Sequence, residues 1–419
     1  MKLSTAKQLA LVLIVALALR LMAGWVWQAR LDGCFGFGDS ESYWRLARAI
    51  ASGEPYGIGE GRAFRTPGYP LLLAPVFLLT GDEPSVMWAR AESALLGTLS
   101  VGAVWWLGRT LFDARAGLVA ASIAAVYPGA IAMGALVLSE AAFCPLMLLQ
   151  LILWTAAWHA RSARRAAVLS GSAGLVAGVA TLVRPSWLLF VPFAIVVGLA
   201  AGKQRARHLG LGAMVLAGLV AAMIPWWVRN ARLTGRFVPT TLQVGASLYD
   251  GLNAHATGAS NMTWSDQATA RFLASERALS AGPEEAQGAL EYRLDRHLRA
   301  ESLAWARAHP GRVAQLMAIK FARLWNFWPN EAAFSAWPIR LAVFMTYVPV
   351  MVLAIVGAWA TIHRGWPYVL CWLPALYFTA LHMVFVSSIR YRQPVMLALM
   401  VLAAGAIVAR LGRNERESV

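Results

Sequence analysis

The chain has 419 residues, of which 59% are hydrophobic and only 14% are charged, whereas soluble domains carry about 25% charged residues. This composition excludes a soluble globular fold, and the 19 tryptophans and 35 glycines are typical of interfacial aromatics and close helix packing in a membrane protein. The formal net charge of +16 would suggest a nucleic-acid-binding protein if the chain were soluble, but basic cytoplasmic loops account for much of it, and we predict no nucleic-acid partner.

The first apolar stretch predicts an uncleaved membrane helix. It follows Lys7 and continues to Trp27 without a small-residue cleavage site, which argues against a secretory signal peptide. Counting from this helix, ten apolar segments have the length needed to cross a bilayer. They cover residues 8–29, 87–108, 116–134, 141–160, 167–183, 186–202, 208–228, 337–358, 366–386 and 394–411. Pro70–Thr80 is about half that length, and we expect a re-entrant or membrane-surface helix there.

Basic residues mark one side of the predicted bundle. They fall in alternate loops, which the positive-inside rule assigns to the cytoplasm. With ten spans both termini are then cytoplasmic, and two long segments, residues 30–86 and 229–336, lie outside. The basic residues that set this orientation are Lys2, Lys7, Arg109, Arg115, Arg161, Arg164, Arg165, Lys203, Arg205, Arg207, Arg364, Arg410, Arg413 and Arg416.

Both outer segments are predicted to be helical. Ser40–Ser52 carries apolar residues at helical spacing beside two arginines, as in an amphipathic helix on the membrane surface. In the second segment, turn signals at Thr234-Gly235 and Asp250-Gly251 precede a charged helical stretch over residues 265–308. A break at His309-Pro310-Gly311 and an amphipathic helix over Arg312–Trp328 follow.

The fold class predicted is therefore an all-α integral membrane protein with about ten transmembrane helices. We divide it into a transmembrane catalytic module over residues 1–228, an extracytoplasmic helical segment over residues 229–336, and C-terminal transmembrane helices over residues 337–419. The first outer loop, residues 30–86, belongs to the catalytic module and holds the re-entrant and amphipathic helices.

Five arginines are predicted on the outer side, where the positive-inside rule does not explain them: Arg65, Arg184, Arg229, Arg390 and Arg392. Most stand beside a proline or in a predicted tight turn such as Ser387–Pro394, where the backbone is fixed. Any one of them alone is as well explained by pairing with ordinary phospholipid headgroups. Together they would repel one another without an anion, and the anion found at this depth is a lipid phosphate. We therefore favour a shared phosphate site.

Two acidic residues are predicted on the same side. Asp39 begins the first amphipathic helix, where a helix N-cap is the alternative explanation. Glu140 lies in an outer turn between two apolar segments, where interaction with the helix dipole is the alternative. A carboxylate can accept the proton of an acceptor hydroxyl, or orient that hydroxyl, while arginines neutralise a departing phosphate. The two residue types together fit transfer from a lipid-phosphate donor.

Short motifs in a characteristic order span residues 38 to 394. They are Gly38-Asp39-Ser40-Glu41-Ser42-Tyr43, Arg65-Thr66-Pro67-Gly68-Tyr69-Pro70, Tyr127-Pro128, Leu138-Ser139-Glu140, Arg184-Pro185, Pro225-Trp226-Trp227-Val228-Arg229-Asn230, Thr234-Gly235-Arg236-Phe237 and Arg390-Tyr391-Arg392-Gln393-Pro394. Their order and topology resemble those of the C-type polytopic membrane glycosyltransferases. The similar branch is the bacterial one related to dolichyl-phosphate-mannose protein mannosyltransferases and the lipid A aminoarabinose transferase.

This resemblance implies roles for several residues. It places the catalytic acid of the first outer loop at Asp39, a second acid at Glu140, and a donor-phosphate contact at Arg65. It also implies a polyprenyl-phosphate-linked sugar donor and inversion at the anomeric carbon. The further candidates for substrate binding within the motifs are Glu41, Tyr43, Tyr69 and Asn230.

No metal ligand is carried over from the resemblance. Some members place an acidic residue beside the basic position of the first outer loop and bind a metal nearby, but the neighbour here is Phe64. We predict no cofactor, and the sequence leaves dependence on a divalent metal open.

We therefore predict a hexosyl- or pentosyltransferase of the bacterial inner membrane, with its active site on the extracytoplasmic face. A transporter or flippase for a lipid-linked or anionic substrate is the alternative, although transporters usually show inverted repeats and midplane charges. A ligase or polymerase of O-antigen type is a third possibility. The sequence does not name the sugar or the acceptor, which is a lipid, a protein or a glycan. We expect residues 240–330 to choose the acceptor.

Overall fold

The computed structural model describes residues 4–59, 61–279, 287–329 and 335–417. Apart from one isolated β-bridge between Ile58 and Gly61, the regular structure of these residues is helical. The all-α fold class predicted from composition and apolar segments is confirmed. The helical state follows from the bilayer, because a spanning segment must satisfy its own backbone hydrogen bonds.

Each of the ten predicted spans overlaps a helix, although the span 116–134 is divided between two. Among the described residues, seven helices are long and apolar enough to cross a membrane: α1, α7, α8, α10, α15, α16 and α17. The other three are α4, which carries Arg90 and Glu92, and the shorter α5 and α9. The ten helices are α1 (Thr5–Arg30), α4 (Val86–Leu111), α5 (Ala114–Val126), α7 (Ser139–His159), α8 (Ala163–Val183), α9 (Phe190–Ala201), α10 (Arg205–Thr234), α15 (Trp337–Thr361), α16 (Trp366–Val384) and α17 (Ile389–Glu417).

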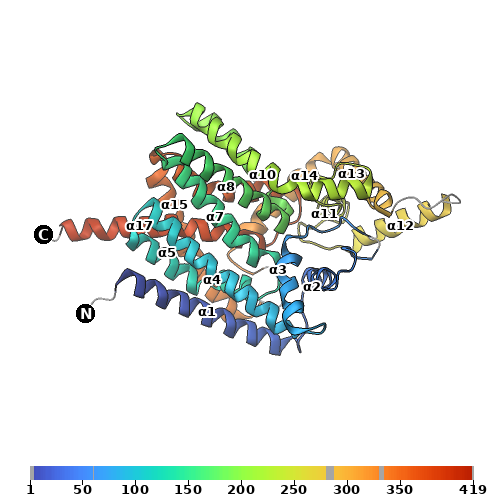
Figure 1. Ribbon diagram of the computed structural model, residues 1–419, viewed down its shortest axis with the longest axis horizontal. Helices are drawn as coiled ribbons and strands as arrows, with labels where there is room; N and C mark the ends of the chain where they lie inside the picture. The colour runs from blue at the N-terminus through green and yellow to red at the C-terminus, as the bar shows by residue number, and fades with distance from the viewer. Residues whose placement is uncertain (1–3, 60, 280–286, 330–334, 418–419) are drawn as a thin grey trace.

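Six further helices belong to the two outer segments and gather at one end of the bundle (Figure 1). Both chain termini lie at the opposite end, as an even number of crossings requires. The break predicted at His309-Pro310-Gly311 is present, since one helix ends at Ala308 and the next begins at Pro310. The helices of the outer segments are α2 (Gly38–Ala51), α3 (Gly68–Thr80), α11 (Val244–Gly251), α12 (Thr263–Leu279), α13 (Gln287–Ala308) and α14 (Pro310–Trp325).

Several boundaries differ from the prediction. The predicted tight turn Ser387–Pro394 is wrong, because α17 already begins at Ile389 and includes Pro394. Proline at this position has no N–H to donate to the carbonyl of Arg390, four residues earlier in the helix. The predicted turn signal at Asp250-Gly251 is instead the end of α11. The predicted end of a span at residue 228 is also too early, since α10 continues to Thr234 and ends at Gly235 in the left-handed region.

The predicted span 116–134 is broken in the middle. α5 ends at Val126, Tyr127 is extended, and the short helix α6 (Pro128–Met133) begins a new turn. Proline at position 128 disfavours helical backbone at the preceding residue and has no N–H to donate to the carbonyl of Ala124.

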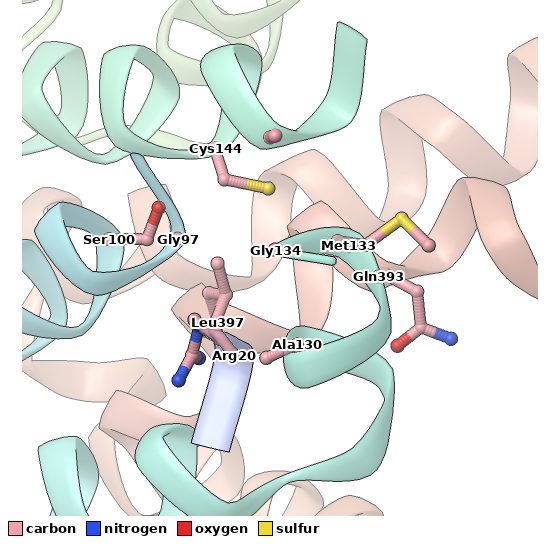
Figure 2. A pocket seen from close by; sticks show the side chains of 10 residues that line it. Arg20, Gly97, Ser100, Ala130, Met133, Gly134, Cys144, Gln393 and Leu397 are labelled. Atoms are coloured by element: carbon pink, nitrogen blue, oxygen red, sulfur yellow. The ribbon is translucent and has the colours of Figure 1, made fainter. Parts of the chain in front are cut away.

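A buried arginine from another helix compensates for this break. Arg20 of α1 donates hydrogen bonds to the carbonyl oxygens of Ala16, Ala124 and Ala125 at 2.9–3.2 Å. Its side chain borders a pocket of only about 10 Å³ between α1, α4, α6, α7 and α17 (Figure 2), room for about one water molecule. The guanidinium therefore caps the end of α5 inside the bundle, where a free carbonyl would be costly.

Candidate active site

Five charged side chains form one network at the end of the bundle that carries the outer helices. They are Asp39, Arg65, Glu140, Arg184 and Arg390, which we call the carboxylate–guanidinium cluster. They come from α2, the loop before α3, and the ends of α7, α8 and α17. Three guanidinium groups face two carboxylates, so the cluster carries one net positive charge.

Asp39 lies in the first turn of α2. The helix has Phe37 as its N-cap and no side-chain capping bond, so the capping explanation for Asp39 is wrong. Its Oδ1 instead lies 2.7 Å from Nη2 of Arg65, and its Oδ2 lies 3.3 Å from both Nη atoms of Arg390. The side chain is 36% exposed, which makes it the member of the cluster most open to a substrate.

The charge of Asp39 is set by these arginines. Burial disfavours the carboxylate, but the guanidinium groups of Arg65 and Arg390 outweigh burial and hold the pKa of Asp39 below its ordinary value. Asp39 is therefore ionised at neutral pH, as a group that receives a proton must be.

Glu140 lies deeper, in the first turn of α7, and its side chain is fully buried. Its Oε1 lies 2.9 Å from Nη1 of Arg184 and 2.5 Å from Nε of Arg390. A second contact of 3.2 Å joins Oε2 to Nη2 of Arg390, so this pair is bidentate. A buried carboxylate between two guanidinium groups fixes their positions, and removing it would leave two inner charges without their anion.

Arg390 joins the two acids. It stands in the first turn of α17 and contacts both Asp39 and Glu140, whose positions in the chain are about 350 and 250 residues away. The side chains of Arg65, Arg184 and Arg390 are 10–18% exposed. The buried Nε atoms of Arg65 and Arg184 have no hydrogen-bond partner in the described parts of the chain.

A close backbone contact brings the two chain segments that carry Arg65 and Arg184 together. A Cβ atom added to Gly68 would lie 2.6 Å from backbone atoms of Leu182 and Val183 at the end of α8. Only glycine permits this approach of α3 to α8. The contact sets the separation of the two arginines, which stand within three residues of it.

An aromatic ring packs against two of these arginines. Cζ of Arg184 and Cζ of Arg390 lie 5.4 and 5.7 Å from the ring centroid of Tyr391. The Tyr391 ring stacks on the buried imidazole of His382, with centroids 4.4 Å apart and an interplanar angle of 5°. Neither residue is among the sequence-predicted candidates. The position of Tyr391 between two arginines in the last motif is the only sequence signal for it.

Tyr43 of α2 and Tyr69 of α3 are two predicted substrate-binding residues; Tyr43 contacts the cluster, and Tyr69 packs against Tyr43. Nη1 of Arg65 lies 3.4 Å from the hydroxyl of Tyr43, and the two tyrosine rings meet edge to face at 5.0 Å. Tyr69 is fully buried, and its hydroxyl lies 3.5 Å from Oγ of Ser93. Glu41 points elsewhere, since its half-exposed side chain pairs with Arg45 on the outer face of α2.

Arg229 and Asn230 border the Arg65 loop without joining the cluster. Arg229 donates to the carbonyl of Tyr56 at 3.2 Å and to Oδ1 of Asn230 at 3.0 Å. The hydroxyl of Tyr56 in turn donates to the carbonyls of Arg65 and Thr66. Arg229 is thus one residue removed from the cluster and supports the loop that holds Arg65.

The structure places Arg392 outside the cluster. Its side chain is fully buried, its Nη1 donates to the carbonyls of Leu324 and Asn326, and its Cζ lies 3.7 Å from the ring centroid of Tyr347. Helix geometry explains the difference from Arg390, because residues two apart on a helix point to different sides. The tight turn expected from the sequence would have allowed both to face one site.

The described residues include no group of three or more His, Cys, Asp or Glu side chains arranged to hold a metal ion. The two carboxylates of the cluster are each occupied by arginines.

The family comparison covers the region between two of these arginines. A family model described as dolichyl-phosphate-mannose-protein mannosyltransferase matches residues 65–228. The match therefore starts at Arg65, includes Glu140 and Arg184, and ends before Arg229. No protein of curated function matches the sequence.

Solved structures share the fold. The apo form of the oligosaccharyltransferase of Archaeoglobus fulgidus matches with a TM-score of 0.62 and 16% identity, over 99% of this chain and 52% of that chain. The archaeal oligosaccharyltransferase AglB from the same organism, in complex with an inhibitory peptide and a dolichol-phosphate, matches with a TM-score of 0.61 and 14% identity, over 99% and 52%. ArnT from Cupriavidus metallidurans bound to undecaprenyl phosphate matches over 96% and 78%, with 17% identity and a TM-score of 0.46.

These comparisons confirm the resemblance predicted from the motifs. The chain shares the fold of these archaeal oligosaccharyltransferases, and its residues 65–228 match the family model described as dolichyl-phosphate-mannose-protein mannosyltransferase. It spans about half the length of the archaeal oligosaccharyltransferases that it matches.

Proposed function

We propose that this protein is a membrane glycosyltransferase that moves a sugar from a polyprenyl-phosphate carrier to an acceptor hydroxyl outside the cytoplasm. One observation carries the proposal: Arg390 bridges a deep carboxylate, Glu140, and an open carboxylate, Asp39, beside two further arginines. In this proposal the donor phosphate binds the arginines and the acceptor hydroxyl binds beside it, at Asp39.

Asp39 is the residue proposed to act on the acceptor. The acceptor oxygen attacks the anomeric carbon and forms the new glycosidic bond. The bond from that carbon to the phosphate oxygen breaks, and its electron pair leaves with the polyprenyl phosphate. The acceptor hydroxyl gives its proton to the Asp39 carboxylate, or is held by it in line for attack. A single displacement of this kind inverts the configuration at the anomeric carbon.

The arginines are proposed to hold the donor phosphate. The cluster has one net positive charge, and Arg65 and Arg184 each have a buried Nε–H group without a partner in the described residues. Such preorganised donors stabilise the negative charge that develops on a departing phosphate. Arg229 is proposed to act through the Arg65 loop, which it borders.

The orientation proposed from the basic loops fits this reaction. The plasma membrane of a bacterium would hold the termini in the cytoplasm and the cluster, with α2, α3 and the outer segments, on the far side. A hydrophobic polyprenyl chain would then reach the cluster from the bilayer, and the acceptor would reach Asp39 from outside.

The test uses purified protein in proteoliposomes with a labelled polyprenyl-phosphate sugar. A glycosyltransferase releases free polyprenyl phosphate in the presence of its acceptor, whereas a flippase changes only the sidedness of the intact donor. The Asp39→Asn variant should still bind the donor but should release no free polyprenyl phosphate. Full release by this variant would refute the role of Asp39. Lipid mass spectrometry of a deletion strain should show the glycosylated carrier that accumulates, and thereby the sugar.

A further inference from the structure

A second site-like feature lies in the outer segment, beside the Arg65 loop. A groove of about 420 Å³ separates the strip that follows α10 from one face of α13. The strip contributes Phe237, Val238 and Leu242, and α13 contributes Arg296, Arg299 and Leu303. This volume lies within the range of about 300–1,000 Å³ that is typical of small-ligand sites. We call this feature the outer groove.

The two walls of the outer groove differ in chemistry. The strip is apolar: Phe237 is 60% exposed, whereas Val238 and Leu242 are buried. The α13 wall is basic. Arg299 is already engaged, because its Nε lies 2.7 Å from Oδ2 of the buried Asp295. Arg296 is exposed and has no hydrogen bond or ion pair within the described residues. The groove thus offers one unpaired guanidinium beside an apolar surface.

A tryptophan of the kind found at membrane interfaces lies next to the outer groove. Trp227, near the outer end of α10, donates its Nε1–H to the carbonyl of Pro239 at 2.7 Å, and its ring meets that of Phe237 at 5.4 Å. Tryptophan with a polar anchor and an apolar ring is typical of the membrane–water interface. On the same helix, Ile224 and Val228 are exposed and lead toward the hydrocarbon.

The floor of the outer groove is joined to the candidate active site. Leu242 donates its backbone N–H to the carbonyl of Ala63 at 2.9 Å. Glu291, on the same helix as Arg296, accepts the backbone N–H groups of Arg62 and Ala63 at 2.8 and 3.0 Å. Both walls of the outer groove therefore contact Ala63, which is two residues from Arg65.

We propose that the outer groove binds an anionic lipid, with the headgroup phosphate on Arg296 and the first part of an acyl chain along Phe237 and Leu303. A guanidinium selects phosphate by charge and geometry, and the exposed side chains of Phe237 and Leu303 offer apolar surface to an acyl chain. Occupation of the groove steadies the Arg65 loop through Leu242 and Glu291. This last step rests on the proposed function, whereas lipid binding does not.

Binding is tested on the full-length protein with a photoactivatable phosphatidylglycerol and a zwitterionic phosphatidylcholine that carries the same photoactivatable chain. Labelled peptides are mapped by mass spectrometry. The proposal expects phosphatidylglycerol to label residues 237–242 and 292–303 in preference to phosphatidylcholine. Arg296→Glu should reduce that labelling about tenfold, the effect expected from losing one charge-assisted hydrogen bond. Phe237→Ala should also reduce it.

Arg271→Glu on α12 is the matched control, because it makes the same charge change at an exposed arginine of the outer segment outside the groove. It should leave labelling unchanged, and unchanged melting temperatures should show that all variants are folded. Equal labelling by the two lipids, or full labelling of Arg296→Glu, would overturn the proposal. Competition by glycerol phosphate as strong as that by intact phosphatidylglycerol would also overturn it, because the apolar wall would then contribute nothing.

Labelling needs neither sugar nor turnover, so its outcome and that of the transferase assay are separate. If transfer is active, Arg296→Glu should raise the KM for the donor in phosphatidylglycerol membranes and leave it unchanged in phosphatidylcholine membranes. An equal KM increase in both membranes would show that Arg296 affects the donor without a lipid in the groove, and would refute the coupling.

Discussion

Asp39→Asn and Glu140→Gln form a matched pair of substitutions, because each removes one negative charge from the carboxylate–guanidinium cluster and keeps the shape of the side chain. The structure predicts that Glu140→Gln mainly lowers stability, whereas Asp39→Asn mainly lowers turnover. Glu140 is fully buried between Arg184 and Arg390, so removing its charge leaves two guanidinium groups without their inner anion. Breaking a buried pair in this way costs about 3–5 kcal/mol. We therefore expect Glu140→Gln to lower the free energy of unfolding by about 3 kcal/mol, the lower end of that range, because Arg184 and Arg390 are partly exposed.

Asp39 is 36% exposed and pairs with Arg65 and Arg390 near solvent. Exposed pairs contribute only about 0–1 kcal/mol, so Asp39→Asn should lower stability by about 1 kcal/mol or less. It removes the proposed proton acceptor, however, and a positioned general base accounts for about 10²–10⁴ in rate. The turnover of donor to free polyprenyl phosphate should fall by that factor, while donor binding persists.

The assay measures unfolding in mixed micelles and turnover in proteoliposomes for each variant. Asp82→Asn serves as the control, because Asp82 is an exposed aspartate in the loop between α3 and α4. It should match the unsubstituted protein in both measurements. If Glu140→Gln proved as stable as the control, the buried anion would not hold the arginines as we reason. If Asp39→Asn kept normal turnover, Asp39 would have no chemical role.

Three further outcomes are expected. Arg392→Met should lower the free energy of unfolding by about 2 kcal/mol through the lost hydrogen bonds to Leu324 and Asn326, with an unchanged KM for the donor; a raised KM would return Arg392 to the phosphate site. Gly68→Ala should raise the KM for the donor and lower the free energy of unfolding by about 1–3 kcal/mol, because its Cβ would clash with the end of α8. Gly210→Ala is the control, because a Cβ at Gly210 has no neighbouring atom within 4 Å, and it should change neither quantity. Arg65 and Arg390 lower the pKa of Asp39 in the free protein, and a bound donor phosphate would compete for these arginines and weaken that effect. The acid limb of kcat/KM for the donor, which reports the free protein, should therefore lie at lower pH than the acid limb of kcat, which reports the donor complex. Coincident limbs would contradict this competition.

Sequence patterns were sufficient to predict most of the fold. Long apolar segments must be helices in a bilayer, because no water is present to satisfy the backbone, and the predicted spans other than 116–134 each overlap one long helix of the structure. The pattern did not predict the break at Tyr127-Pro128, since the composition on both sides of Pro128 is equally apolar. It also could not show that Arg20, more than 100 residues away, would bond to the carbonyl of Ala124.

For the candidate site, too, the sequence predicted one part of the arrangement and only the structure revealed the rest. The sequence alone predicted that Asp39, Glu140, Arg65, Arg184 and Arg390 would lie on one side of the membrane, because alternating basic loops indicate the side on which each helix ends. Only the tertiary structure decided which of these charges meet. Arg390 and Arg392 are two residues apart, yet one joins both carboxylates and the other is buried against Tyr347. The start and phase of α17 decide this, because helix ends are set by packing and by proline rather than by average hydropathy. The same holds for the approach of α3 to α8 at Gly68, which depends on a contact between distant segments that no local pattern encodes.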